Sequence, residues 1–327
     1  MLTKTFFVMM ISFIISLIIG SILVPFFKKK KVDQRLSEYL SDTHKDKKDT
    51  PTMGGLIFTI STMLTIILLL IFNKIKISNG LIIIMFTFTS YSLIGFLDDF
   101  LIIKRNNNQG LKEYQKLLLQ LLVSIIFFLI FMLDNEPLLW IHTFHLKLNI
   151  GWFYGLFILL VLVSSSNAVN LTDGLDGLAA GLSIIAFITF GILSYNTGWL
   201  DGYEDIGIFA FSLVGSLLGF LFFNSHPAKI FMGDTGSLSL GATLGTYAIL
   251  TRHELLLIII GIVFVIETLT CVIQRTYYKF TKKRIFPMTP IHHTFEKLGF
   301  KEIDIVKMFW VLGLIGSMIA LGFGVWL

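Results

Sequence analysis

The chain has 327 residues, of which 55% are hydrophobic and only 14% charged, and its mean hydropathy is +0.81. An ordinary soluble domain carries roughly 25% charged residues, so this composition excludes a soluble globular protein. The formal net charge of +5 does not indicate nucleic-acid binding, because basic residues beside membrane spans are expected. The single cysteine, Cys271, excludes an intrachain disulfide and any cysteine-based metal site.

Long apolar runs recur along the chain, each near the roughly 20 residues that cross about 30 Å of hydrocarbon. Hydropathy predicts ten spans, at 5–27, 54–72, 81–97, 116–134, 152–169, 177–195, 206–223, 237–250, 255–274 and 305–326. The runs are continuous and rich in Leu, Ile and Phe, which excludes a transmembrane β-barrel with its alternating strands. With no internal repeat or linker, residues 1–327 are predicted to form one all-α, polytopic membrane domain.

The basic residues indicate the orientation of these spans. The loops after the first, third, fifth, seventh and ninth spans, with the adjoining span ends, hold 21 of the 26 Lys and Arg residues. By the positive-inside rule these loops are cytoplasmic and both termini face outward. The outward segment 135–151 contains Trp140, His142, His145 and, just beyond it, Trp152, and is predicted to be an amphipathic stretch at the membrane interface.

Two adjacent carboxylates, Asp98 and Asp99, close the third predicted span at its cytoplasmic end. Near the bilayer, neighbouring carboxylates need a cation or a proton. The pair therefore points to Mg²⁺ binding, to acceptance of a proton from a substrate, or to both. A solvated helix end is the alternative.

The segment Asn167–Gly177 joins the fifth and sixth spans and gathers Asn170, Asp173, Gly174 and Asp176. Close glycines let the backbone approach a ligand, and a helix N-terminus offers N–H groups to phosphate. Asp173 and Asp176 are three residues apart, so they share one face if a helix begins at Thr172. The alternative is an ordinary Asx-type turn that caps the helix.

Two later loops on the same face carry further polar groups. Asp234 lies between glycines and suits a carboxylate ligand to Mg²⁺, with a helix N-cap as the alternative. His292 and His293 follow Pro290, and since the other loops supply hard oxygens and no thiol, phosphate binding or proton transfer fits them better than a transition metal. An ordinary solvated loop is the alternative for the two histidines.

All four loops lie on the face assigned to the cytoplasm, where Lys104, Arg105, Lys112 and Lys116 add positive charge. Carboxylates that converge with cations predict a Mg²⁺-assisted phosphoryl-transfer site at the membrane surface. No Walker loop or kinase signature is present in the sequence, so ATP is not implied.

These motifs resemble the phospho-N-acetylmuramoyl-pentapeptide transferase (MraY) family of the polyprenyl-phosphate N-acetylhexosamine 1-phosphate transferase superfamily. The matching segments run in family order and are Pro51–Gly55, Asp98–Phe100, Gly110–Leu111, Gln115–Leu117, Asn167–Gly177, Phe231–Ser237 and Pro290–His293. The resemblance implies a Mg²⁺-dependent enzyme of peptidoglycan biosynthesis in the bacterial cell membrane. It converts UDP-MurNAc-pentapeptide and undecaprenyl phosphate to lipid I and UMP, and the family suggests a homodimer.

The resemblance also implies roles for individual residues. Asp98 resembles the carboxylate that deprotonates the lipid phosphate, Asp99 its catalytic partner, and Asp234 the Mg²⁺ ligand. Asn170, Asp173 and Asp176 resemble a polar cluster in which Asp173 is counted as catalytic, as are His292 and His293 of the histidine motif. The substrate-binding positions are Lys48, Lys116, Asn170, Gly174, Leu175, Asp176, Asn224 and Phe231.

The sequence departs from the family pattern at two places. Thr294 stands where many members have a third histidine, and Ile102 stands where many have a lysine, whose charge Lys104 or Arg105 is expected to replace. The basic segment 28–48 is expected to meet acidic membrane lipid or the substrate phosphates, or to act only as a topology determinant.

Three alternatives stay open. An ion-coupled transporter is the runner-up from another class, with Glu267 as an intramembrane acid. Within the class, the runner-up is a sister transferase that moves GlcNAc 1-phosphate. The reaction itself is expected to be a direct attack, with a double displacement through a covalent aspartate as its rival.

The lipid tail requires an apolar groove open to the bilayer, and helix interruptions at 181–219 and near Gly261 are predicted to admit it.

Overall fold

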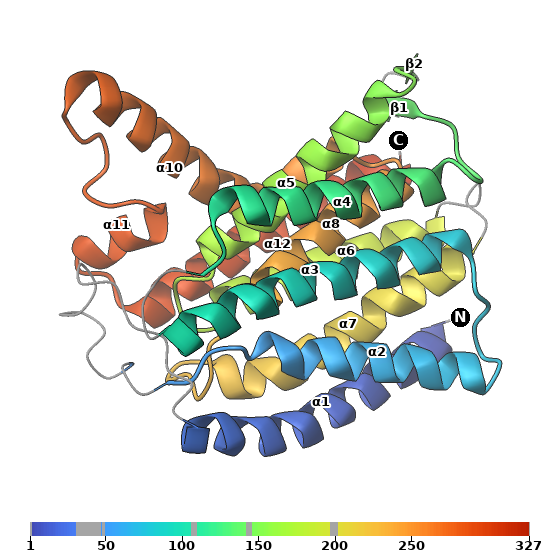
Figure 1. Ribbon diagram of the computed structural model, residues 1–327, viewed down its shortest axis with the longest axis horizontal. Helices are drawn as coiled ribbons and strands as arrows, with labels where there is room; N and C mark the ends of the chain where they lie inside the picture. Colours follow the sequence, from blue (N-terminus) through green and yellow to red (C-terminus); the bar gives the residue numbers. More distant parts are fainter. Residues whose placement is uncertain are drawn as a thin grey trace.

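The computed structural model describes residues 2–30, 47, 50–105, 110–141, 146–196 and 202–326. Its elements in chain order are α1 (Leu2–Lys30), α2 (Gly55–Ile71), α3 (Asn79–Arg105), α4 (Glu113–Phe131), β1 (Leu138–Ile141), β2 (Leu146–Asn149), α5 (Phe153–Thr172), α6 (Leu178–Asn196), α7 (Tyr203–Asn224), α8 (Gly233–Leu250), α9 (Leu256–Ile260), α10 (Ile262–Thr281), α11 (Ile291–Lys297) and α12 (Glu302–Trp326). Figure 1 shows an elongated helix bundle with both chain termini toward one end, opposite to α11.

Every predicted span coincides with a helix, and the ninth is divided at Gly261 into α9 and α10. In the described residues, seven helices are long and apolar enough to cross a membrane: α1, α3, α4, α5, α6, α7 and α12. The all-α polytopic class is therefore confirmed. Ten crossings, outward termini and the membrane side of each loop stay predictions.

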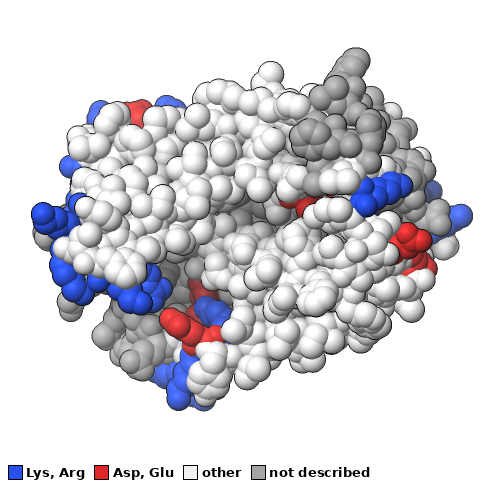
Figure 2. Space-filling model, turned by 90° about the horizontal axis from the view of Figure 1, so that it is seen from above, with Lys and Arg blue, Asp and Glu red and all other residues white. Residues whose placement is uncertain are grey.

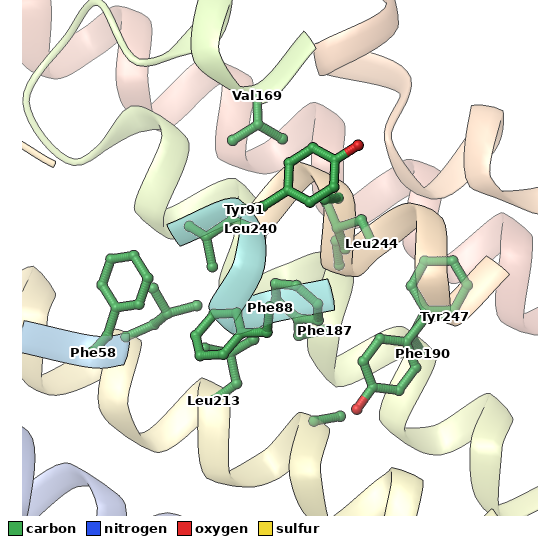
Figure 3. Close-up of a cluster of buried hydrophobic side chains, with 14 of the residues drawn as sticks. Phe58, Phe88, Tyr91, Val169, Phe187, Phe190, Leu213, Leu240, Leu244 and Tyr247 are labelled. Atoms are coloured by element: carbon green, nitrogen blue, oxygen red, sulfur yellow. The ribbon is translucent and has the colours of Figure 1, made fainter. Parts of the chain in front are cut away.

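The bundle is built around α7 and α8, whose side chains are almost all buried. Figure 3 shows part of this core, with Phe88 of α3, Leu213 of α7 and the ring of Phe187 of α6 near that of Tyr247 of α8. Because neighbours surround α8 on all sides, it needs no polar face. The Gly, Ser and Thr residues of α8 are buried together with its apolar ones.

The segment 135–151, predicted only as an interfacial stretch, contains an antiparallel hairpin of β1 and β2. Leu138 pairs with Asn149 and Ile141 with Leu146, and the Lys147 ammonium lies 4.1 Å from the Trp140 ring centroid. His142 and His145 fall outside the described residues, as does most of the basic segment 28–48.

Charged side chains gather at the two ends of the bundle. Figure 2 shows a broad, almost uncharged middle, with Lys and Arg collected at the end that carries α10 and α11 in Figure 1. This distribution is typical of a protein whose middle lies in hydrocarbon.

At the opposite end, a buried polar network joins the hairpin to α5 and to the turn after α8. Arg252 donates to the carbonyl oxygens of Glu136 (2.7 Å) and Leu138 (2.6 Å) and to the Tyr154 hydroxyl (3.1 Å). That hydroxyl donates in turn to Glu254 Oε1 at 2.7 Å. Burial raises the pKa of Glu254 from 4.5 to about 7.

The stability of the detergent-solubilised protein is expected to fall with rising pH through this group. The folded pKa lies above the unfolded one, so the contribution of Glu254 is complete below pH 4.5 and is lost as the pH rises through 7. It amounts to at most about 3 kcal/mol. Glu254→Gln keeps an acceptor for Tyr154 and is expected to flatten the melting temperature measured between pH 5 and 8. An unchanged slope in the variant contradicts this assignment.

Candidate active site

Four helix ends meet at the α11 end of the bundle and bring together side chains that are far apart in sequence. Lys116, in the first turn of α4, places its ammonium 2.7 Å from Asp234 Oδ2 and 3.3 Å from Asp98 Oδ1. Asn170, near the end of α5, donates to Asp234 Oδ1 at 2.7 Å and to the Ser237 hydroxyl at 2.9 Å. Asp234 is therefore the point where α3, α4, α5 and α8 converge.

Asp98 and Asp99 are adjacent but have different surroundings. Asp98 accepts the Leu111 backbone N–H at 2.8 Å, and a Cβ built on Gly110 would lie 2.5 Å from its carboxylate. Asp99 accepts the backbone N–H groups of Asp234 (3.1 Å) and Thr235 (3.0 Å) and the Thr235 hydroxyl (2.6 Å). These are the orphan donors at the N-terminus of α8, so Asp99 acts as a helix cap that fixes the position of Asp234.

Close approach of α3 to α8 depends on Gly95. A Cβ built there would lie 2.1 Å from the backbone oxygen of Asp234. We expect Gly95→Ala to push α8 away and to reduce the activity of the site at least tenfold, with a destabilisation of about 1–3 kcal/mol. Gly322→Ala on α12 is the matched control, because nothing lies within 4 Å of its built Cβ. Equal activity and melting temperature in the two variants contradict the expectation.

Asp173, the residue after α5, faces this cluster and has no side-chain hydrogen bond within the described part of the chain. Burial, followed by the charge of Asp234, raises the pKa of Asp173 to about 8. Carboxylates that crowd together in this way are relieved by a proton or a cation.

The donor set around Asp234 fits Mg²⁺. Asp98, Asp173, Asp234 and Asn170 offer the hard oxygen ligands that this ion prefers. Lys116 supplies one positive charge to Asp98 and Asp234 but lies within ion-pair distance of neither Asp173 oxygen. The cluster therefore has both the ligands and the excess negative charge for a divalent cation.

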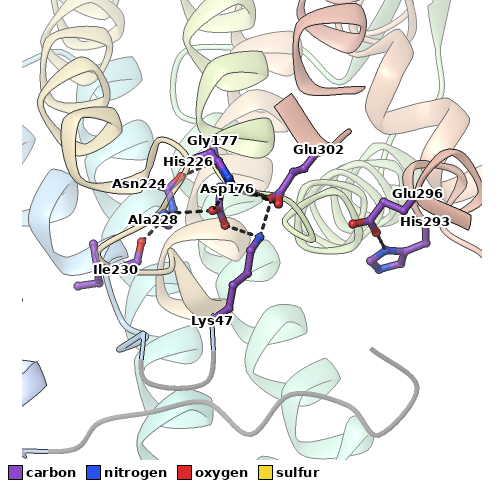
Figure 4. Close-up of polar contacts among 10 residues, drawn as sticks. All are labelled: Lys47, Asp176, Gly177, Asn224, His226, Ala228, Ile230, His293, Glu296 and Glu302. Atoms are coloured by element: carbon purple, nitrogen blue, oxygen red, sulfur yellow. Dashed lines mark hydrogen bonds and ion pairs between the residues drawn. The ribbon is translucent and has the colours of Figure 1, made fainter. Parts of the chain in front are cut away.

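A second polar cluster lies at the start of α6 and α12, as Figure 4 shows. Asp176 is buried, accepts the Lys47 ammonium at 2.7 Å and the Ala228 backbone N–H at 3.1 Å, and lies 3.1 Å from His226 Nδ1. Glu302 receives the same ammonium at 2.6 Å and the Asp176 backbone N–H at 2.8 Å. Asp176, His226 and Glu302 have the ligand types of a metal site, but the Lys47 ammonium already pairs with both carboxylates and so takes the place of a metal ion.

Asn224, at the end of α7, fixes the loop beside this second cluster. Its side-chain oxygen accepts the Gly177 N–H at 3.1 Å, and its amide donates to the Ile230 carbonyl at 2.9 Å (Figure 4). Phe231 follows in that loop, and its backbone pairs with Pro51 and Gly54 at 2.8 Å each. Leu175 is buried, whereas Gly174 is exposed.

The histidine motif lies on α11, against the turn between α5 and α6. His292 is buried with its Nδ1 3.1 Å from Glu267 Oε2, and a Cβ built on Gly174 would lie 2.3 Å from His292 Nε2. His293 Nδ1 is 2.6 Å from Glu296 Oε2 (Figure 4). The Thr294 hydroxyl donates to the Met288 carbonyl, so the residue in place of a third histidine closes the loop before α11.

Most of the predicted site residues are thus brought together, and two further ones emerge. Lys48 lies outside the described residues, whereas its neighbour Lys47 reaches Asp176. Glu302 is the second acceptor of Lys47. Arg105, expected to replace a family lysine, donates to the carbonyl of Gly110 at 3.0 Å, beside Asp98.

The fold and the site define a membrane-embedded transferase, and comparison with known proteins agrees. Residues 81–252 match the model of glycosyl transferase family 4, and residues 47–58 match phospho-N-acetylmuramoyl-pentapeptide-transferase signature 1. The chain belongs to the phospho-N-acetylmuramoyl-pentapeptide transferase family.

Curated relatives with that name match nearly the whole chain. The protein of Staphylococcus saprophyticus is 46% identical over 96% of this chain and 98% of its own length. Those of Geobacillus sp. (strain WCH70) and Bacillus subtilis (strain 168) are 43% and 42% identical, covering 97% and 98% of both chains.

Proposed function

We propose that the chain transfers phospho-N-acetylmuramoyl-pentapeptide from its UDP-linked precursor to undecaprenyl phosphate, giving lipid I and UMP for peptidoglycan synthesis. The observation that carries this proposal is the convergence of Asp98, Asp173 and Asp234 with Lys116 at one end of an apolar helix bundle. The near full-length similarity to transferases of that name supports it. We propose that the site faces the cytoplasm at the bacterial cell membrane, and the excess of basic residues at that end supports this orientation. A homodimer is proposed from the family resemblance alone.

In the proposed reaction Asp98 accepts the proton of undecaprenyl phosphate, or keeps that phosphate deprotonated. A phosphate oxygen of the lipid then attacks the phosphorus attached to the sugar. The new P–O bond forms as the bond to the bridging oxygen breaks, and UMP leaves with the electron pair of that bond. Lys116, between Asp98 and Asp234, stabilises the negative charge that develops on the phosphates.

Mg²⁺ is proposed as the cofactor, with Asp234 as ligand and Asp98, Asp173 and Asn170 as the surrounding oxygen donors. When bound, the ion would neutralise the pyrophosphate and make UMP a better leaving group. Asn170 orients the Asp234 carboxylate through its 2.7 Å hydrogen bond, and Asp99 positions it through the cap of α8.

The nucleoside is proposed to bind beside Gly174, Leu175, Asp176 and Phe231, where Asn224 fixes the backbone. Lys47 and Glu302 hold Asp176 in place. His292 and His293 lie on α11, which borders the turn that contains Gly174. They are proposed to contact the substrate phosphates or to transfer a proton.

The lipid tail is proposed to enter an apolar cavity of about 380 Å³ between α5 and the broken pair α9 and α10. The cavity is lined at one end by Val169, next to Asn170, and at the other by Glu254, with Gly261 at the break between the helices. An isoprenoid tail in it would have its phosphate close to Asp98 and Asp234. The predicted interruption near Gly261 supports this placement.

The proposal is tested by UMP release from purified protein in detergent with undecaprenyl phosphate and Mg²⁺. UDP-MurNAc-pentapeptide and UDP-GlcNAc are offered separately. Release with the muramoyl substrate alone, abolished by EDTA and restored by Mg²⁺, supports the proposal. Release with UDP-GlcNAc alone assigns the chain to the sister branch, and no release with either contradicts a transferase. Covalent capture of a phosphosugar on Asp98 or Asp173 in the absence of lipid contradicts direct attack.

A further inference from the structure

A second cavity, of about 420 Å³, lies between the projecting end of α10 and α11, outside the residues assigned to the reaction. Arg275, Arg284 and Lys297 line it, together with the neutral polar side chains of Gln274, Tyr278 and Thr289. No Asp or Glu belongs to this lining, and none of the ion pairs within the described residues involves the three cations. The cavity therefore suits an anion.

The loop after α10 carries Arg284, forms one wall of the cavity and is held in place against α10. Gln274 accepts the backbone N–H groups of Ile285 (2.9 Å) and Phe286 (3.1 Å), and its amide donates to the Phe286 carbonyl at 3.2 Å. Arg284 itself donates to the Pro287 carbonyl at 3.3 Å. Because the loop is fixed at both of these points, the Arg284 guanidinium is already held in position. Binding of an anion therefore costs little conformational entropy.

The cavity is within reach of the proposed reaction site. His292, at the start of α11, lies against Gly174, and Lys297, at the end of the same helix, is five residues further on. Five residues of helix advance about 8 Å, whereas a five-residue peptide extends to at most about 17 Å. A pentapeptide attached to a sugar near His292 can therefore reach the cavity.

We propose that this cavity binds the C-terminal carboxylate of the pentapeptide of the UDP-linked substrate, an inference that rests on the proposed function. Every linear pentapeptide ends in this carboxylate, and it is the part of the chain farthest from the sugar. A planar guanidinium suits a carboxylate because it donates two parallel hydrogen bonds, and Lys297 adds a third donor. The lining loop with Arg284, Met288 and Thr289 leads directly to the histidines of the site, which favours the substrate over a lipid headgroup.

The test compares UDP-MurNAc-pentapeptide with its C-terminal carboxamide, by steady-state UMP release. With the unmodified protein, we expect KM for the carboxamide to be about tenfold higher than KM for the free acid. Arg284→Gln and Lys297→Gln are each expected to raise KM for the free acid several-fold, with kcat and the carboxamide KM unchanged. Arg284→Lys is expected to restore part of the difference.

Lys279→Gln is the matched control, because it removes the same charge from an exposed position of α10 that does not line the cavity. Equal KM values for the two substrates with the unmodified protein overturn the proposal. A variant effect of the same size on both substrates also overturns it, since the cations would then act on the diphosphate that both substrates carry. An equal effect of Lys279→Gln overturns it as well, since the overall positive charge of this end of the protein would then be the cause.

Vesicles separate a lipid headgroup from the peptide. If the variants differ from the unmodified protein only in vesicles that contain phosphatidylglycerol, and equally for both substrates, the cavity binds lipid and the proposal is overturned. Absence of UMP release from either substrate with the unmodified protein contradicts the proposed function instead.

Discussion

Asp234→Asn is expected to lower kcat for UMP release by roughly a thousandfold or more while the protein stays folded. The substitution keeps the size of the side chain but removes the charge that Lys116 meets at 2.7 Å and that Asn170 orients. An amide also binds Mg²⁺ more weakly than a carboxylate does. UMP release at saturating concentrations of both substrates is the measurement, with the melting temperature as the check on folding.

Asp304→Asn serves as the control, since Asp304 is exposed in the first turn of α12 and belongs to neither polar cluster. We expect it to retain full activity. If Asp234→Asn retains more than about a tenth of the activity at all Mg²⁺ concentrations, the carboxylate at the junction of the four helices is not a metal ligand. A loss that excess Mg²⁺ partly restores identifies a weakened ion site.

The helices could be predicted from the sequence because hydrocarbon imposes long apolar segments whatever their packing. Their division at Gly261 could also be anticipated, since glycine weakens a helix interior. The hairpin of β1 and β2 could not, because Leu138–Asn149 has no strong turn signal and its pairing depends on Arg252, which binds the carbonyl of Leu138 from more than a hundred residues away.

The site residues were predictable as a set but not in their individual contacts. Asp98, Asp173 and Asp234 could be grouped by their common face, whereas the cap that Asp99 provides for α8 is a tertiary contact across 136 positions. Lys47 and Lys48 are neighbours with the same chemistry, so the sequence gives no reason to choose between them. Glu302 was hidden for a similar reason, because its partners come from the start of α6 and from Lys47.

The different surroundings of the two adjacent aspartates lead to opposite expectations for their amide variants. Asp98→Asn keeps acceptors for Leu111 and Lys116, so its melting temperature is expected to stay unchanged. It loses the group that takes the proton of the lipid phosphate, and kcat is expected to fall by about 10² to 10⁴. Its activity should no longer rise with pH on the acid side of the profile.

Asp99→Asn instead turns an amide N–H₂ toward donors of Asp234 and Thr235, which weakens the cap of α8 by about 1–2 kcal/mol. We expect a melting temperature lower by several degrees and a smaller loss of kcat, with the pH profile of the unmodified protein retained. Thermal unfolding and the pH dependence of UMP release, measured on both variants, decide the matter. If Asp99→Asn keeps its stability but loses the acid limb of the profile, Asp99 rather than Asp98 accepts the proton, and the cap is secondary to the chemistry.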